Sequence, residues 1–382
     1  MKLFKASVLL FLIAIISCTN NANTIASLES IQQELKKEHA PDKRVELFDI
    51  QFTSKNNQFI VSGETTTKKA LSLLLDSLKS KNIDFKNKVR VLPDSAVGNK
   101  IYALGNNSVI NIRSKPKHSA ELGTQGLLGM QLNVLDKKGS WYRVQTPDKY
   151  ISWVDAGGIQ RMTAQELTQW NEKDKIIYTS NFGFVYEKKD DSSTRVSDIS
   201  FGGILVFKKE HKSFYEVMYP DGRIGFVKKS EAVFYATWLK NNPSNADFIE
   251  SSAKTMLGVP YLWGGTSPKG NDCSGFTKTV YLMNGFVIPR DASQQVHAGK
   301  VVDEDLKFEG LEKGDLMFFG TPATADKKMR VTHVGIWLGN GKGEFIHSAS
   351  NVHLSSINEN EPHYDKFNTN RYLGSRRYLG VN

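Results

Sequence analysis

The 382-residue sequence predicts an α+β protein with a small α/β N-terminal module, two small β-barrels and a larger C-terminal domain. A chain of this length exceeds what one hydrophobic core usually serves, so several domains are expected. Two stretches in the middle of the chain repeat one another at a constant offset of 73 residues, which indicates a duplicated module. After Pro243 the pattern changes to helical segments followed by strand-like runs.

Residues 1–17 have the features of a signal peptide. Lys2 and Lys5 precede an apolar run, residues 8–16, that is too short for a spanning helix of ~20 apolar residues. The run ends at Ile-Ile-Ser-Cys, which resembles the lipobox of bacterial lipoproteins. That resemblance implies that Cys18 is the lipidated N-terminus of an exported protein, membrane-anchored in the cell envelope and facing the periplasm. The alternative is a buried N-terminal strand or helix.

Residues 18–95 predict the small α/β module. Apolar residues at helical spacing predict helices near residues 25–37 and 70–78, and alternating runs predict strands near 46–53, 58–62 and 89–92. This order resembles a BON-like domain in pattern alone. The module contains no recognisable chemistry, so we expect it to be a spacer or an attachment module.

The repeated stretches, residues 98–160 and 174–235, predict the two β-barrels. Trp141-Tyr142 corresponds to Phe214-Tyr215, and the short alternating runs are separated by turn residues. Residues 109–116 resemble the opening of bacterial SH3-like domains.

The segment between the two copies, residues 163–174, predicts a short helix. Thr163 is its expected cap, and Glu166 stands at the capping-box position.

Charge narrows the expected partners. The net charge of +10 and the pI near 9.3 suit anionic polymers such as cell wall and lipid head groups. No nucleic-acid motif accompanies the charge, so no nucleic-acid partner is expected. A solvated surface is the simpler explanation for the dispersed lysines.

Cys273 is the only thiol left once Cys18 carries lipid, so it has no intramolecular disulfide partner. Such a thiol is either a buried small residue or a reactive one. Cys273 opens an apolar-periodic segment that predicts a helix, and a helix N-terminus stabilises a thiolate. We therefore expect the pKa of Cys273 to lie below ~8.5.

Two histidines lie downstream in strand-like runs, His333 within residues 331–337 and His347 after a glycine-rich turn. If the two strands pair antiparallel, His333 takes the thiol proton and His347 orients its imidazole. The rival is a zinc site formed by Cys273, His333 and His347, but no fourth ligand stands at a characteristic short spacing. We expect no metal and no cofactor.

Three motifs closely resemble the NlpC-type papain-like peptidases of bacterial cell walls. They are Tyr-Leu-Trp-Gly-Gly with Asn-Asp-Cys-Ser-Gly-Phe, then Thr-His-Val-Gly-Ile, then Phe-Ile-His-Ser-Ala. The resemblance implies a papain-like catalytic domain over residues 243–382, preceded by two SH3-like barrels. It also implies a metal-free cysteine peptidase with Cys273 as nucleophile, His333 as base and His347 as the third member.

The same resemblance implies substrate-binding roles for Tyr261, Asp272 and Ser274. Tyr261 is expected to supply an oxyanion hydrogen bond beside the Cys273 N–H. Residues 290–295 resemble the family's Arg-x-(Ser or Ala)-Ser-x-Gln stretch, which makes Ser293 a ligand for a substrate carboxylate. Arg290 is either a further ligand or a member of an exposed ion pair.

A narrower resemblance is to the subfamily with two SH3-like domains that cleaves γ-D-glutamyl-L-diamino acid bonds in murein peptides with a free N-terminal L-Ala. Residues 119–125 resemble its acidic loop, so Glu121 and Asp272 are expected to face the substrate ammonium. Tyr150 is expected to be its cleft-facing tyrosine, or else an ordinary rim aromatic of the barrel.

The expected partners are therefore murein peptides or peptidoglycan, with a membrane contacted through Cys18, and the chain is expected to act as a monomer. One alternative keeps the enzyme but assigns it intact crosslinked peptidoglycan as substrate. A second alternative is a non-catalytic wall-binding lipoprotein.

Overall fold

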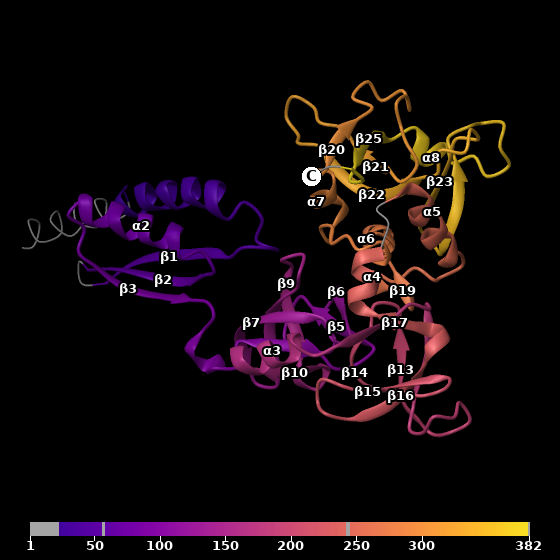
Figure 1. The fold of residues 1–382 in the computed structure, drawn as a ribbon. Coiled ribbons are helices and arrows are strands. Elements are labelled where there is room, and N and C mark those ends of the chain that lie inside the picture. The colour runs from indigo at the N-terminus through magenta and orange to yellow at the C-terminus, as the bar shows by residue number, and fades with distance from the viewer. Residues whose placement is uncertain (1–22, 56–57, 242–244, 381–382) are drawn as a thin grey trace, which may run out of the picture. The chain divides into compact units, whose positions relative to one another are not determined.

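The computed structural model describes residues 23–55, 58–241 and 245–380, so the expected signal peptide and Cys18 lie outside the described residues. The chain divides into two compact units, Met1–Gly98 and Asn99–Asn382, and both helices and sheets are present in each (Figure 1). The α+β fold class is confirmed. Across the described ranges, no helix is long and apolar enough to span a membrane.

The first unit is a three-stranded sheet with two helices. After a helix over residues 23–39, the elements are β1 (Phe48–Lys55), β2 (Gln58–Thr65), α2 (Lys68–Ser80) and β3 (Phe85–Val91). β1 pairs antiparallel with β2, whereas β2 pairs parallel with β3 because α2 forms the crossover between them. The predicted order of helices and strands is confirmed.

The second unit begins with two seven-stranded sheets. The strands of the first are β4 (Tyr102–Gly105), β5 (Val109–Arg113), β6 (Leu122–Leu127), β7 (Gln131–Lys138), β8 (Trp141–Gln145), β9 (Ile151–Asp155) and β10 (Ile159–Met162). The strands of the second are β11 (Lys175–Tyr178), β12 (Phe182–Tyr186), β13 (Arg195–Ser200), β14 (Ile204–Glu210), β15 (Phe214–Met218), β16 (Ile224–Lys228) and β17 (Ala232–Phe234).

The two sheets have the same strand order, read from opposite ends, and every strand of the second starts 73 residues after its counterpart. The sequence repeat is therefore a structural duplication. Between them lies α3 (Ala164–Asn171). Thr163 Oγ1 accepts a hydrogen bond from the Glu166 N–H at 3.2 Å, and Glu166 Oε2 accepts one from the Thr163 N–H at 2.7 Å. The predicted capping box is thus confirmed.

The C-terminal part combines helices with one six-stranded sheet in the order β20-β25-β21-β22-β23-β24. Its helices are α4 (Tyr235–Asn241), α5 (Ala246–Thr255), α6 (Cys273–Met283), α7 (Ala292–Gln295) and α8 (Lys366–Thr369). Its strands are β18 (Thr266–Ser267), β19 (Gly270–Asn271), β20 (Lys300–Val302), β21 (Leu316–Thr321), β22 (Arg330–Trp337), β23 (Glu344–Ser348), β24 (Val352–Ser356) and β25 (Tyr372–Arg377).

The core of this part forms where α6 packs on β22 and β23. Phe276 and Val280 of α6 are fully buried against Val334 and Ile336 of β22, together with Ile249 of α5. This packing fixes the start of α6 beside the middle of the sheet.

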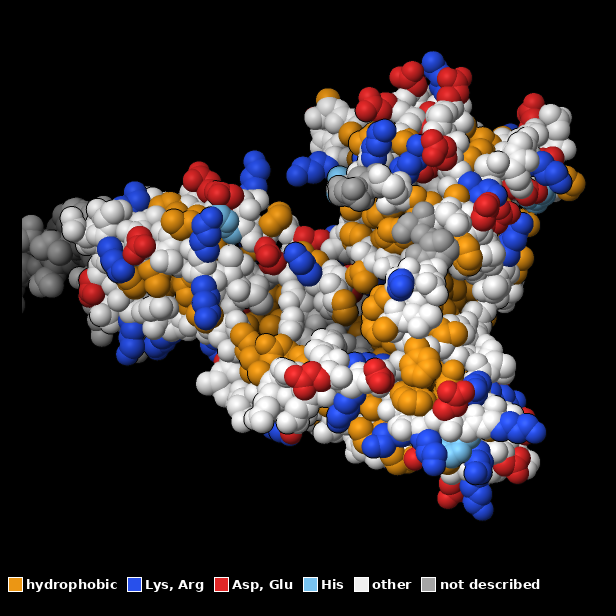
Figure 2. Space-filling view, viewed as in Figure 1, with side chains coloured by type: hydrophobic (Ala, Val, Ile, Leu, Met, Phe, Trp, Pro, Cys, Tyr) orange, Lys and Arg blue, Asp and Glu red, His pale blue; other side chains and the backbone are white. Residues whose placement is uncertain are grey.

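An apolar cavity of about 670 Å³ lies between the two barrels, α4 and α6. Trp170, Phe234, Trp238 and Leu282 line it, and Figure 2 shows hydrophobic side chains gathered around this part of the surface. Neither Cys273 nor its neighbours contribute to its walls. The cavity is therefore separate from the residues singled out by the sequence motifs.

Candidate active site

The thiol of Cys273 stands at the first position of α6, as the sequence predicts. Asp272 is the N-cap, and its Oδ1 accepts from the Gly275 N–H at 2.7 Å. The first N–H groups of a helix have no intrahelical acceptor, so the Cys273 N–H points out of the helix end with its partial positive charge. The sulfur and a hydrogen-bond donor are thus placed side by side.

The surroundings of the thiol overturn one expectation. Burial raises the pKa of Cys273 to about 12, and the negative charge of Asp272 adds to this effect. Hydrogen bonds from the backbone of Val334 and Ser274, and the charge of Arg290, lower the pKa but do not compensate. The expectation of a lowered pKa was wrong because the side chain is only 8% exposed, and desolvation of a thiolate outweighs one helix N-terminus.

His333 and His347 meet as predicted. β22 and β23 are antiparallel, with Gly335 opposite His347, and His333 Nε2 lies 2.7 Å from His347 Nδ1. His347 Nε2 lies 3.0 Å from Ser355 Oγ on β24, so the three side chains form a continuous chain of hydrogen bonds. Ser355 was not anticipated, because no sequence motif marks a serine on the strand beyond the second histidine.

The two imidazoles are held neutral. Burial lowers the pKa of His333 to about 4, with Arg371 adding to the effect, and burial lowers the pKa of His347 to about 2. His333 Nε2 is engaged with His347, which leaves Nδ1 as the nitrogen able to accept a proton. That tautomer requires His333 to donate to His347, and His347 in turn to donate to Ser355.

The thiol stands on α6 and the histidine chain on β22 and β23, and α6 packs against both of these strands. Cys273 shares a buried cluster with Val334, the residue after His333, and the backbone of Val334 lowers the pKa of the thiol. A neutral thiol beside a neutral imidazole can transfer its proton during attack on a carbonyl. The arrangement therefore suits nucleophilic catalysis.

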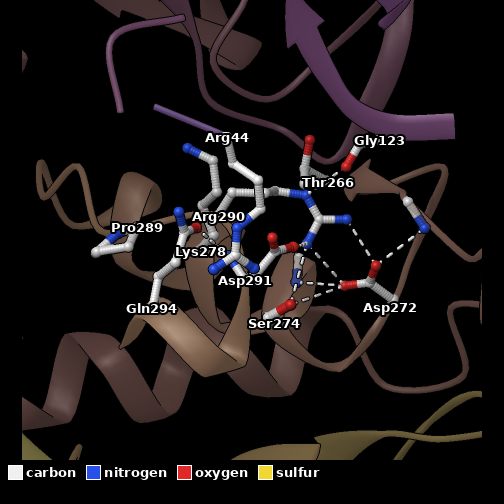
Figure 3. A network of polar contacts seen from close by, with 12 residues as sticks. Arg44, Gly123, Thr266, Asp272, Ser274, Lys278, Pro289, Arg290, Asp291 and Gln294 are labelled. Atoms are coloured by element: carbon white, nitrogen blue, oxygen red, sulfur yellow. Dashed lines mark hydrogen bonds and ion pairs between the residues drawn. The ribbon is translucent and has the colours of Figure 1, made fainter. Parts of the chain in front are cut away.

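A buried ion pair supports the start of α6 (Figure 3). Arg290 donates to Asp272 through Nη2 at 2.6 Å and Nη1 at 3.1 Å, and Nη1 also donates to Ser274 Oγ at 3.0 Å. Arg290 is 2% exposed, so its alternative as an exposed ion pair was wrong. Burial opposes the guanidinium charge, but the Asp272 carboxylate outweighs burial and raises the pKa of Arg290.

This network uses most of the bonding capacity of two expected substrate ligands. Asp272 also accepts from the Gly264 N–H at 2.9 Å and from Ser274 Oγ at 3.2 Å. Its carboxylate is thus neutralised by Arg290 before any substrate ammonium arrives. Substrate contacts by Asp272 and Ser274 stay a prediction, while the structure shows them shaping the N-terminus of α6.

The first barrel reaches directly into this network. Arg290 Nε donates to the Gly123 carbonyl at 3.0 Å, which ties β6 to the catalytic helix through one guanidinium. Gly264, at φ +82°, lies against the Leu122 carbonyl, and a Cβ there would come within 2.1 Å of that oxygen. Only glycine permits this approach.

Glu121 lies at the exposed edge of the same contact. Its Oε1 accepts from Trp263 Nε1 at 2.7 Å, and the Trp263 side chain is 63% exposed. The acidic loop expected to face a substrate is therefore held beside the segment that precedes the nucleophile.

The remaining predicted ligands lie around the same centre. Burial raises the pKa of Tyr261, and the charges of Cys273 and Asp272 raise it further. Tyr150 lies against Gly123, and its charge is among those acting on Arg290. Ser293 is partly exposed in α7.

A second buried ion pair joins the first barrel to α6. Lys278 Nζ lies 3.3 Å from Asp148 Oδ2, with both side chains largely buried. In the repeat, Asp221 takes the place of Asp148 and accepts from Asn106 of the first barrel at 2.9 Å. The duplicated Pro-Asp turn therefore docks onto a different neighbour in each copy.

The sequence matches two family models. The model described as NlpC/P60 family matches residues 258–376, and the model described as bacterial dipeptidyl-peptidase Sh3 domain matches residues 112–159. Both matches cover the segments that form the site.

Several relatives and solved structures are similar over most of the chain. The gamma-D-glutamyl-L-lysine dipeptidyl-peptidase of Bacillus cereus is 33% identical over 268 residues, which cover 68% of this chain and 76% of that protein. The Bacillus subtilis protein of the same name is 32% identical over 232 residues, covering 59% and 71%. The crystal structure of an NlpC/P60 family protein from Bacillus cereus superposes with a TM-score of 0.61 at 27% identity, covering 73% of this chain and 99% of that one.

Proposed function

Because this chain belongs to the NlpC/P60 family of cysteine peptidases, which act on peptidoglycan, we propose that it hydrolyses the γ-D-glutamyl-L-diamino acid bond of murein peptides with a free N-terminal L-Ala. Relatives named gamma-D-glutamyl-L-lysine dipeptidyl-peptidases support this choice of bond. The structural observation that supports this proposal best is the guanidinium of Arg290. It forms hydrogen bonds both to Gly123 of the first barrel and to Asp272, the cap of the catalytic helix.

The proposed chemistry assigns each polar group one task. His333 Nδ1 accepts the Cys273 proton as the sulfur attacks the scissile carbonyl, and the same proton then passes to the leaving amine. The Cys273 N–H and the Tyr261 hydroxyl stabilise the oxyanion. His347 and Ser355 hold the His333 ring in the tautomer that keeps Nδ1 free. Water then hydrolyses the acyl-enzyme.

The proposed specificity places Glu121 opposite the substrate ammonium. Asp272 already has Arg290 as its cation, so Glu121 is the carboxylate that remains for an added positive charge. Glu121 is exposed, so its attraction for an ammonium is worth only about 0.2–1 kcal/mol.

The test compares kcat/KM on L-Ala-γ-D-Glu-L-Lys and its N-acetylated form. We expect a preference of up to about fivefold for the free amine, as an exposed pair implies. Glu121→Gln should reduce this preference to near one without abolishing turnover. Equal native rates on both peptides would refute the requirement for a free amine and favour crosslinked peptidoglycan as substrate.

We propose in addition that the protein is exported and lipid-anchored through Cys18. The short apolar leader and the Ile-Ile-Ser-Cys sequence support this. A non-catalytic wall-binding role is the weaker alternative, because the Cys-His-His set is intact and its imidazoles are hydrogen-bonded in series.

A further inference from the structure

Arg371 lies directly between α8 and β25 and is held in one orientation by hydrogen bonds. Its Nη1 donates to Thr332 Oγ1 at 2.8 Å, while Nε and Nη2 donate to Asn368 Oδ1 at 3.1 Å and 3.0 Å. Asn368 is fixed in turn by Asp365, the cap of α8. The guanidinium is therefore preorganised by neutral acceptors.

The negative charge of Asp365 acts on this cation and raises its pKa, but Asp365 bonds Asn368 and forms no ion pair with Arg371. Within the ranges that the structure describes, no carboxylate lies within ion-pair distance of Arg371. Its guanidinium instead stacks over the ring of Phe367 at 4.4 Å, and Phe367 is 71% exposed. Partial burial lowers the pKa of Arg371, because the charged guanidinium loses part of its hydration. A fixed, partly desolvated guanidinium with unused N–H groups suits a carboxylate.

Arg371 adjoins the candidate active site. Thr332, its partner, precedes His333 and lies where the pairing of β21 with β22 shifts register, since Phe319 faces His333 but Gly320 faces Val331. Such a bulge turns side chains that would otherwise alternate toward the same side. The charge of Arg371 acts on the pKa of His333, and the thiol of Cys273 acts on that of Arg371.

The path of the proton during the reaction indicates which part of the substrate lies near Arg371. The base that receives the thiol proton must pass it to the leaving amine, so the amino acid carrying that amine lies beside His333. Arg371 bonds the residue next to His333, whereas Glu121 and the first barrel lie by Trp263 and Asp272. The two ends of the substrate are thus served by different elements.

We propose that Arg371 binds a carboxylate of the leaving diamino acid and so selects the amino acid on the leaving side of the scissile bond. This rests on the proposed function. Two carboxylates share the required chemistry: the α-carboxylate of a C-terminal diamino acid, and the distal carboxylate that diaminopimelate has and lysine lacks. A bidentate pair with a planar guanidinium discriminates acid from amide because the amide lacks the charge and one acceptor.

The test measures kcat and KM for each combination of four enzymes and three substrates. The substrates are L-Ala-γ-D-Glu-L-Lys, its C-terminal carboxamide, and the peptide with meso-diaminopimelate in place of lysine. The enzymes are native, Arg371→Gln, Arg371→Lys, and Lys366→Gln as a control that removes an exposed cation from the same helix. Circular dichroism and thermal melting show whether each variant folds.

For the native and Lys366→Gln enzymes we expect about tenfold or greater loss of kcat/KM, mainly in KM, when the bound carboxylate is missing. A loss on amidation identifies the α-carboxylate, and a preference for diaminopimelate identifies the distal one. Arg371→Gln should abolish the difference, and Arg371→Lys should retain part of it.

Equal native rates on all three peptides would overturn the proposal whatever the variants do. An unchanged difference in folded Arg371→Gln would overturn it too. Absence of hydrolysis of every peptide by native enzyme would instead refute the proposed function on which it rests.

Discussion

Replacing Arg290 with methionine should destabilise the protein by about 3 kcal/mol, at the low end of the 3–5 kcal/mol cost of orphaning a buried charge. Methionine retains much of the buried volume but removes the cation from Asp272, which is 6% exposed. The carboxylate keeps donors from Gly264, Gly275 and Ser274, and this residual solvation is why the low end applies. The Gly123 carbonyl also loses its donor.

Thermal unfolding measured by circular dichroism checks this value. For a unit of this size (Asn99–Asn382), about 3 kcal/mol corresponds to roughly 5 °C in Tm. Arg223→Met is the matched control, because Arg223 pairs with Asp221 at a similar 2.7 Å but is 40% exposed. An exposed pair contributes about 0–1 kcal/mol, so Tm should fall by less than about 2 °C.

A double variant separates loss of charge compensation from loss of packing. Asp272→Asn in the Arg290→Met background removes the orphaned charge, so Tm should recover in part. A decrease for Arg290→Met no larger than that for Arg223→Met would refute the reasoning. So would a double variant no more stable than Arg290→Met alone, since that would mean that the buried charge was not the cause.

Cys273→Ala and His333→Ala should abolish hydrolysis, and full activity in Cys273→Ala would exclude the cysteine mechanism. His347→Ala should leave residual activity. Ser355→Ala should reduce kcat less than His347→Ala does. The pKa of about 4 for His333 predicts that kcat/KM falls only below pH about 5, because the protonated imidazole cannot accept the thiol proton. The pKa of about 12 for Cys273 predicts that kcat/KM does not decrease as the pH rises to about 9, and that thiolate ultraviolet absorbance is weak at neutral pH. Substantial thiolate absorbance at pH 6 would contradict the pKa values of both Cys273 and His333. Cys18→Ala should shift the protein from the membrane to the soluble fraction, and unchanged partitioning would exclude the lipid anchor.

Much of the fold was predictable because its signals are local or periodic. The repeat fixed the correspondence of seven strands with seven, since a duplicated sequence forms the same pairings. The position of Cys273 at a helix start and the meeting of His333 with His347 also follow from neighbouring residues. Family motifs supplied their chemical interpretation.

The features that sequence reasoning missed are long-range or depend on burial. Arg290 bonds Gly123 across 167 positions of the chain, and no local pattern indicates whether such an arginine is buried. The pKa of Cys273 is raised, whereas its position at a helix N-terminus predicted a lowered value, because desolvation and the charge of Asp272 both raise it. Ser355 emerges only once β24 is paired with β23.

Mass spectrometry of the products from parallel digests tests the central claim most directly. Free murein tripeptide, free tetrapeptide and whole sacculi are incubated with native enzyme and with Cys273→Ala. The account predicts release of the dipeptide L-Ala-γ-D-Glu from the free peptides by native enzyme alone, and slower release from sacculi. Cleavage at any other bond, or faster release from sacculi than from free peptides, would contradict it.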